Sequence, residues 1–191
     1  MTTVFFVRHA EPNFRNHDDL TRELSPKGEK DRLLVTEFFA PIRIDAVLSS
    51  PYKRAVDTVA DLASGRDLEI IRIEAFRERK VGPGWIEDFD RFCLQQWQDF
   101  SYKLDGGESL REVQDRSVNA LSEVLREYSG KTLVIGGHGT ALSTILNYYD
   151  SNFGYRDFMR IKDLMPWVVR LDFSGTECRR IQAVNLFEPR Q

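Results

Sequence analysis

Two histidines of the chain, His9 and His138, each follow a short apolar run that is typical of a buried strand. Arg8 directly precedes His9, and Arg54 lies in a polar cluster after another apolar run. An arginine guanidinium presents a planar fork of N–H donors that matches the oxygens of phosphate. Two histidines at strand ends with arginines nearby therefore indicate one shared anion site, with phosphate as its natural ligand.

The elements that must position these residues follow from the apolar pattern. Four apolar runs predict strands, at 4–7, 45–49, 68–73 and 132–135. Ser25 followed by Pro26 predicts the start of a helix, and Pro51 opens a second one. Ser109 is expected to cap a long helix that ends near Gly130. The strands and helices therefore alternate along the chain.

This alternation predicts an α/β fold, a three-layer α/β/α sandwich with a mainly parallel sheet and helices on both faces. The runs 167–173 and 179–184 predict a closing strand pair. The aromatic-rich segment at about 76–107 predicts a small helical cap inserted in a single domain that spans 1–191. Ligands of such sheets bind beyond the carboxyl ends of the strands, where the two histidines fall.

Composition excludes several classes of protein. Among 191 residues, 27 Lys and Arg oppose 30 Asp and Glu, for a net charge of -3, which disfavours a nucleic-acid partner. Cys93 and Cys178 have no CxxC partner, so a reducing compartment is the simplest setting. No run approaches the roughly 20 apolar residues of a membrane span. We therefore expect a soluble cytoplasmic protein without a membrane partner.

Other catalytic classes lack their signatures in this sequence. A metal hydrolase would need a ligand set such as H-E-x-x-H, and none is present. The G-x-S-x-G elbow of serine hydrolases is absent, as are the G-x-G-x-x-G and P-loop motifs of nucleotide-binding proteins. We therefore expect no metal and no cofactor.

Five motifs carry a specific resemblance when read in order. They are V-R-H-A-E at 7–11, S-S-P-Y-K-R-A-V-D-T at 49–58, F-R-E-R-K-V-G at 76–82, G-G-E-S at 106–109 and G-G-H-G-T at 136–140. Together they resemble the histidine phosphatase superfamily, whose best-known member is phosphoglycerate mutase. The resemblance spans most of the chain and implies the same sandwich with a helical cap.

The resemblance also implies roles for individual residues. His9 matches the nucleophile that accepts the phosphoryl group, while Arg8, Arg54 and His138 match the phosphate pocket. Glu78 matches the proton donor. The chemistry agrees, because phosphoryl transfer needs an in-line nucleophile, cations around the phosphate oxygens and a proton for the departing oxygen. Adjacent arginines favour the neutral, attacking form of the imidazole.

The chain departs from the family pattern at two places. Ala10 replaces the glycine that usually follows the nucleophilic histidine. Arg15 occupies the position where mutase-like members often carry asparagine, with Asn13 and Asn16 on either side of it. We retain Asn13 as a candidate contact for the substrate phosphate.

These observations favour a metal-independent phosphatase that acts on a small phosphomonoester, with a phosphoprotein side chain as another substrate class. The chain lacks the insertions of the longer mutases, and a mutase needs a closing lid to keep its phosphohistidine from water. The alternatives are phosphoglycerate mutase-type phosphoryl transfer and an inactive module of the same fold that binds a phosphate ester or a protein. Aromatic residues of the cap and of 148–158 could form a homodimer interface.

Two further groups of residues have competing interpretations. Cationic and aromatic residues of the cap segment either contact an additional anionic or aromatic group of the substrate or form a solvated surface: Arg79, Lys80, Trp85, Arg91 and Lys103. Glu108 and Ser109 are predicted to serve the start of the following helix rather than catalysis.

Overall fold

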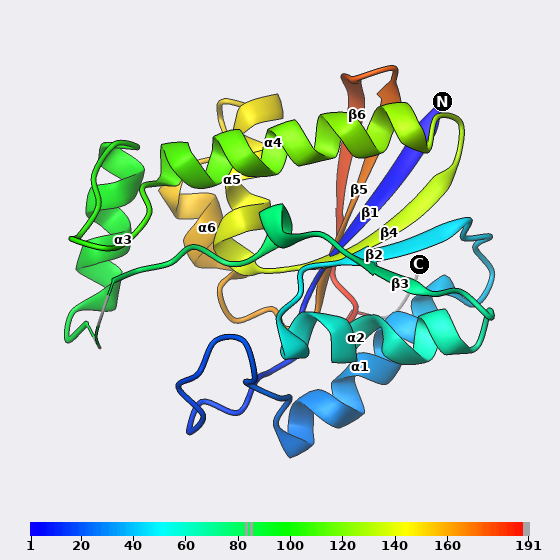
Figure 1. The fold of residues 1–191 in the computed structure, drawn as a ribbon, viewed down its shortest axis with the longest axis horizontal. Helices are drawn as coiled ribbons and strands as arrows, with labels where there is room; N and C mark the ends of the chain where they lie inside the picture. The colour runs from blue at the N-terminus through cyan, green and yellow to red at the C-terminus, as the bar shows by residue number, and fades with distance from the viewer. Residues whose placement is uncertain (83, 85, 189–191) are drawn as a thin grey trace.

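The computed structural model describes residues 1–82, 84 and 86–188, and these form one six-stranded sheet between layers of helices (Figure 1). The strand order is β3-β2-β4-β1-β5-β6. The first four strands of this order pair in parallel, and β5 and β6 are antiparallel additions. The strands are β1 Thr2–Arg8, β2 Ala46–Ser49, β3 Ile70–Arg72, β4 Thr132–Gly137, β5 Trp167–Ser174 and β6 Glu177–Val184. The predicted mainly parallel sheet and its closing strand pair are confirmed.

Strand β1 lies inside the sheet, with β4 on one side and β5 on the other. Its residues Val4, Phe5, Phe6 and Val7 are all buried because helices cover both faces. A strand covered on both faces reads as a continuous apolar run rather than as an alternating one. This burial explains why residues 4–7 are so uniformly apolar.

Helices α1 (Pro26–Phe39) and α2 (Lys53–Ser64) cover one face of the sheet, the lower layer in Figure 1. The predicted start of α1 is confirmed, since the Ser25 hydroxyl accepts the Gly28 N–H at 3.0 Å and Pro26 occupies the first turn. Helix α2 begins two residues after Pro51, because Tyr52 takes the N-cap position. An apolar cluster between these helices and the sheet fills this layer.

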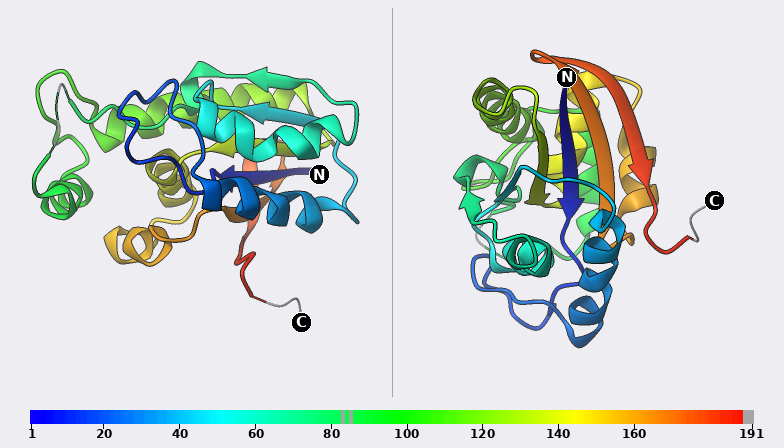
Figure 2. Two further views of the ribbon diagram at one scale, coloured as in Figure 1. Left: turned by 90° about the horizontal axis from the view of Figure 1, so that it is seen from below. Right: turned by 90° about the vertical axis from the view of Figure 1, so that its right-hand side faces the viewer.

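Helices α4 (Leu110–Glu127) and α5 (Gly139–Tyr149) cover the opposite face, the upper layer in Figure 1. They bury the second and larger apolar cluster of the described chain, which includes Phe6, Leu48 and Ile135 from the sheet. The two views of Figure 2 show the sheet between the two helical layers. The predicted three-layer sandwich is therefore confirmed.

The segment between β3 and α4 leaves the sheet and forms the cap. It holds a 3-10 turn, η1 (Glu74–Phe76), and helix α3 (Phe89–Gln98), which lies at the far left of Figure 1. Asp90 of α3 forms an ion pair at 3.2 Å with Lys162, which follows helix α6 (Tyr155–Ile161). The cap thus contacts the region that follows α5.

Some boundaries differ from the sequence prediction. Helix α6 was not predicted, because seven residues are too few to show a helical period. Strand β4 continues through Gly136 and Gly137, two residues beyond the predicted end, because both residues pair with β1. Within the described residues, no helix has the length and apolar character that crossing a membrane requires.

Candidate active site

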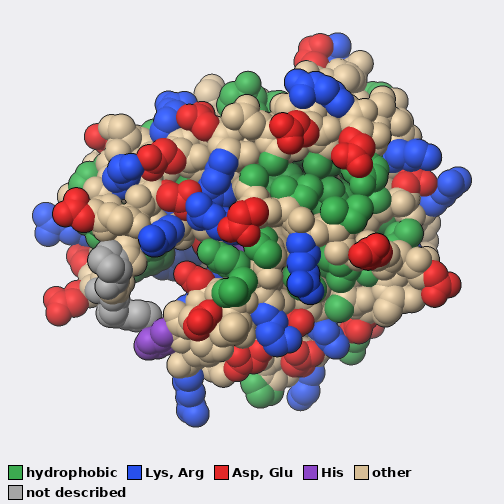
Figure 3. Space-filling view, viewed as in Figure 1, with side chains coloured by type: hydrophobic (Ala, Val, Ile, Leu, Met, Phe, Trp, Pro, Cys, Tyr) green, Lys and Arg blue, Asp and Glu red, His purple; other side chains and the backbone are tan. Residues whose placement is uncertain are grey.

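The carboxyl ends of three neighbouring strands bring the predicted residues together. Arg8 of β1 pairs with Gly137 of β4, and Ser49 of β2 pairs with Gly136. His9 and His138 therefore follow adjacent strands, and their ring centroids lie 5.3 Å apart. Figure 3 shows a hollow at the lower left, between the loop after β1 and the cap, with charged side chains around it.

His9 is held in a defined tautomer by two contacts. Its Nδ1 lies 2.7 Å from the Ala10 carbonyl oxygen, which can only accept, so Nδ1 carries the ring proton. Arg54 Nε donates to His9 Nε2 at 3.3 Å, which requires a lone pair on Nε2. The unprotonated nitrogen of His9 therefore faces a guanidinium that can hold an anion.

The electrostatic surroundings keep both histidines neutral. Burial, together with the charges of Arg54 and Arg8, holds the pKa of His9 well below its usual value. Burial and the charge of Arg54 lower the pKa of His138 in the same way. His9 therefore stays neutral into the acidic range, and the direction of its pKa shift is the one expected from the adjacent arginines.

His138 stands at the N-cap of α5 and is completely buried. Its Nε2 lies 2.8 Å from the Ser50 hydroxyl, and the Tyr52 ring packs at 5.2 Å from its own ring. Its Nδ1 is buried and has no hydrogen-bond partner within the described part of the chain. The hydrogen-bonding capacity of this nitrogen is therefore unused within the described residues.

Arg54 lies on α2 with its side chain 3% exposed, directed toward both His9 and the loop after β1. Its two terminal nitrogens contact Asp19, one donating to the backbone carbonyl at 2.8 Å and the other to the carboxylate at 3.2 Å. Burial lowers the pKa of Arg54, and the charge of Asp19 opposes that shift. The terminal nitrogens of Arg54 are thus already engaged by the backbone and the carboxylate of Asp19.

Arg8 is anchored by backbone carbonyls at the end of α6. Its terminal nitrogen donates to the Ile161 carbonyl at 2.5 Å and to the Leu164 carbonyl at 3.3 Å. Burial lowers the pKa of Arg8 to about 10, against the opposing charge of Glu78. Gly139 leaves room for this guanidinium, because a Cβ there would lie 3.0 Å from Arg8 Nε.

Glu78 reaches the N-terminus of α5 from the cap segment. Its Oε1 accepts the N–H groups of Arg79 at 2.8 Å and Ala141 at 3.1 Å, and its Oε2 accepts that of Thr140 at 3.0 Å. Free N–H groups at a helix start bind anions, and here a side chain uses them. Its charge also acts on Arg8 and Arg54, whose own charges lower the pKa values of His9 and His138.

Asn13 contacts the loop in which it lies. Its side-chain amide donates to Glu23 at 2.5 Å, and its side-chain oxygen accepts the Arg15 N–H at 3.1 Å. Asn16 donates to the other oxygen of Glu23 at 2.9 Å. In this structure both asparagines therefore brace the loop after β1.

The cap residues divide into two groups. Lys80, Arg91 and Lys103 are exposed, as expected of a solvated surface, and Trp85 lies outside the described residues. Arg79 is buried, which that interpretation did not expect. Its guanidinium donates to Gln96 and lies 5.1 Å from the Phe92 ring centroid. It therefore packs inside the cap.

Sequence reasoning missed three residues that shape the site. Ser50 contacts His138, and Thr58 Oγ1 accepts the Ala10 N–H at 2.9 Å. Both belong to the motif at 49–58, so that motif was the available signal. Asp19 lies in a loop with no periodic pattern and had no such signal. Among the described residues, no cluster of His, Cys, Asp and Glu could hold a metal ion.

The site thus brings a buried histidine with an unprotonated nitrogen, a second neutral histidine and two arginines to one end of an α/β sandwich. The model of the histidine phosphatase superfamily, branch 1, matches residues 4–185. The chain belongs to this superfamily, as the sequence motifs predicted.

Known proteins of this fold resemble the chain over most of its length. Phosphoserine phosphatase 1 of Hydrogenobacter thermophilus is 30% identical over 155 residues, which cover 72% of this chain and 71% of that protein. A probable phosphoglycerate mutase GpmB of Salmonella choleraesuis is 25% identical over 159 residues, covering 77% and 74%. The solved structure of Bacillus stearothermophilus YhfR has a TM-score of 0.77 at 21% identity, covering 94% of this chain and 95% of its own.

Proposed function

We propose that the protein is a metal-independent phosphatase that hydrolyses small phosphomonoesters through a phosphohistidine on His9. The observation that carries the proposal is the tautomer of His9, whose unprotonated Nε2 faces Arg54 while Nδ1 donates to the Ala10 carbonyl. A neutral imidazole with this orientation is the attacking form. The low pKa of His9 keeps that form populated.

In the first step, the phosphorus bonds to His9 Nε2 as its bond to the ester oxygen breaks. Arg8, Arg54 and His138 hold the phosphate oxygens, and we retain Asn13 as a further contact, which requires its side-chain amide to leave Glu23. Glu78 gives its proton to the departing oxygen. Among the described residues, Glu78 Oε2 accepts only the Thr140 N–H, so a proton on Oε2 leaves all three backbone contacts in place.

In the second step, water attacks the phosphorus and the bond to Nε2 breaks. Glu78 now accepts a proton from that water, which restores the acid for the next cycle. Inorganic phosphate leaves, and His9 returns to its neutral state. No step in this scheme needs a metal ion or a cofactor.

The test is phosphate release from a panel of phosphomonoesters in the presence of a chelator. Phosphoserine heads the panel because the Hydrogenobacter relative is named for it. We expect activity that the chelator does not affect and that His9→Ala abolishes. Activity that survives in His9→Ala, or that disappears with the chelator, would refute the proposal.

Phosphoglycerate mutase-type transfer is the second candidate, because the Salmonella relative is named a probable mutase. The same assay separates the two when 3-phosphoglycerate is supplied with a bisphosphate primer. A mutase would convert 3-phosphoglycerate to its isomer with little phosphate release. A phosphatase would instead release phosphate and form little of the isomer.

A further inference from the structure

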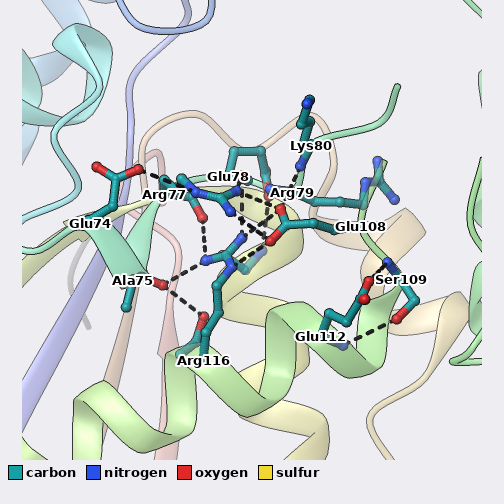
Figure 4. Close-up of polar contacts among 12 residues, drawn as sticks. Glu74, Ala75, Arg77, Glu78, Arg79, Lys80, Glu108, Ser109, Glu112 and Arg116 are labelled. Carbon is teal, nitrogen blue, oxygen red and sulfur yellow. Dashed lines mark hydrogen bonds and ion pairs between the residues drawn. The ribbon is translucent and has the colours of Figure 1, made fainter. Parts of the chain in front are cut away.

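Residues 75–80, which carry Glu78, are fastened to the first turns of α4 by a cluster of charged groups (Figure 4). Glu108, just before α4, accepts two hydrogen bonds from the Arg77 guanidinium, at 2.5 and 2.7 Å. It also accepts the Lys80 backbone N–H at 2.9 Å. One carboxylate therefore fixes the chain on both sides of Glu78.

Arg116 supplies the complementary contacts from α4. Its guanidinium donates to Glu108 at 2.9 and 3.2 Å. It also donates to the backbone carbonyls of Ala75 at 2.6 Å, Arg77 at 3.0 Å and Glu78 at 3.4 Å. Arg116 of α4 thus binds backbone carbonyls of residues 75–78, and Glu108 binds the Lys80 N–H.

The two arginines favour the charged form of Glu108. Burial favours its neutral form, but hydrogen bonds from Arg77 and Arg116 outweigh that effect and hold the pKa of Glu108 at about 2. The same hydrogen bond raises the pKa of Arg77. Because Glu108 is mostly buried, its loss would leave two guanidinium groups without their shared partner.

The expected role of Glu108 at the start of α4 is filled by other residues. Ser109 and Glu112 form a reciprocal capping box, in which Ser109 Oγ accepts the Glu112 N–H at 3.2 Å and Glu112 accepts the Ser109 N–H at 2.8 Å. The prediction for Ser109 is confirmed. The prediction for Glu108 is wrong, because its carboxylate accepts from Arg77, Arg116 and Lys80 instead.

We infer that Glu108 is a positioning residue for the proton transfer by Glu78, acting through Arg77, Arg116 and the Lys80 N–H. Its effect on catalysis is to fix the backbone from which the Glu78 carboxylate reaches the start of α5. This inference rests on the proposed role of Glu78 as proton donor. A small misplacement of a catalytic group lowers rates by about 10²-fold.

The test compares two substrates that differ in their need for a proton. Phenyl phosphate has a poor leaving group that requires protonation, whereas 2,4-dinitrophenyl phosphate loses a stable anion. We measure kcat/KM, which reports the first phosphoryl transfer, for Glu78→Gln, Glu108→Gln and the double variant. Glu112→Gln, at the same helix start, is the matched control.

Glu78→Gln is expected to lose about 10²-fold or more on phenyl phosphate and under about tenfold on the dinitrophenyl ester. Glu108→Gln should show the same selectivity, with a loss of roughly 10- to 100-fold on phenyl phosphate. The double variant should have nearly the same kcat/KM on phenyl phosphate as Glu78→Gln, because both changes impair the same proton transfer. Glu112→Gln should affect both substrates equally.

Thermal unfolding of Glu108→Gln is measured first, because a misfolded variant would also lose activity on both substrates, and a midpoint close to that of the wild type assigns any loss to the site. Equal losses on the two esters, or losses that add to those of Glu78→Gln, would overturn the inference. If Glu78→Gln itself shows no preference between the esters, the proposed proton donor fails instead. The two failures are therefore distinguishable.

Discussion

Arg54 is the side chain on which the geometry of His9 depends most directly. Its Nε contacts His9 Nε2 while its two terminal nitrogens contact Asp19, so three donors in one plane act at once. A lysine ammonium is a point charge and cannot reproduce that fork. A positive charge at position 54 therefore does not by itself reproduce the contacts of Arg54.

We predict that Arg54→Lys lowers kcat/KM by about 10²–10³-fold, the loss typical of removing one aligned donor from an active site. The measurement is steady-state hydrolysis of an aryl phosphate, with thermal unfolding as the control for folding. Activity within a few fold of the wild type would show that charge is sufficient at this position.

At the scale of elements, the loop between β1 and α1 covers the site and is closed at its base. The Ser25 N–H donates to the Glu11 carbonyl at 2.9 Å, and the Ser25 hydroxyl donates to the Glu11 carboxylate at 2.7 Å. Residues Asn13 and Glu23 continue the pairing through the backbone at 2.8 Å. The loop thus has a fixed base and presents Asp19 to Arg54.

We expect the Asp19 carboxylate to compete with the substrate phosphate for Arg54, because it already contacts a terminal nitrogen of that guanidinium. We predict that Asp19→Asn tightens the inhibition by inorganic phosphate about 3- to 10-fold, a modest gain because the Asp19 side chain is half exposed. The Asp19 backbone carbonyl still holds one nitrogen of Arg54, so the guanidinium keeps its orientation. The neighbouring variant Asp18→Asn is the control. Weaker inhibition in Asp19→Asn would mean that its carboxylate orients Arg54 rather than competing with phosphate.

The base of this loop packs directly on the first turn of α1. A Cβ at Gly28 would lie 2.1 Å from the Glu11 carbonyl oxygen, so only glycine permits this approach. We predict that Gly28→Ala destabilises the protein by about 1–3 kcal/mol, seen as a lower midpoint of thermal unfolding. Gly154→Ala, whose Cβ would meet no atom closer than 4.0 Å, should be near neutral. An unchanged midpoint in Gly28→Ala would contradict this packing.

Elements differed in how far the sequence could predict them. The strand ends that carry His9 and His138 were predictable, because a strand buried on both faces has an uninterrupted apolar sequence. The contact of Asp19 with Arg54 was not, since it joins a loop without periodicity to a helix 35 residues away. The network of Glu108 and Arg116 was also missed, because pairing between charged residues leaves no periodic signal.

At the scale of the whole molecule, the buried neutral histidines couple stability to pH. The pKa values of His9 and His138 are lowered on folding, so below about pH 6.5 the unfolded chain binds protons that the folded protein does not. Stability from this source is complete above the unfolded pKa and decreases as the pH falls. Glu108, with a pKa of about 2, contributes a further loss only below its ordinary value of 4.5.

We predict that the free energy of unfolding falls between pH 6.5 and 5 by up to about 1.4 kcal/mol per pH unit for each of the two histidines. Urea denaturation across this range measures the slope. His138→Gln should reduce the slope by about half, because it removes one of the two buried imidazoles. A flat profile down to pH 5 would contradict the burial of neutral histidines.

The proposed mechanism requires His9 Nε2 to accept the phosphoryl group. The most direct measurement is mass spectrometry of protein quenched in alkali during turnover of an aryl phosphate, since phosphohistidine survives alkali and decays in acid. We expect a phosphoryl group, at most one per chain, on the peptide that contains His9, and none on His9→Ala. A phosphoryl group on another residue, or the same phosphoryl group in His9→Ala, would contradict this role of His9.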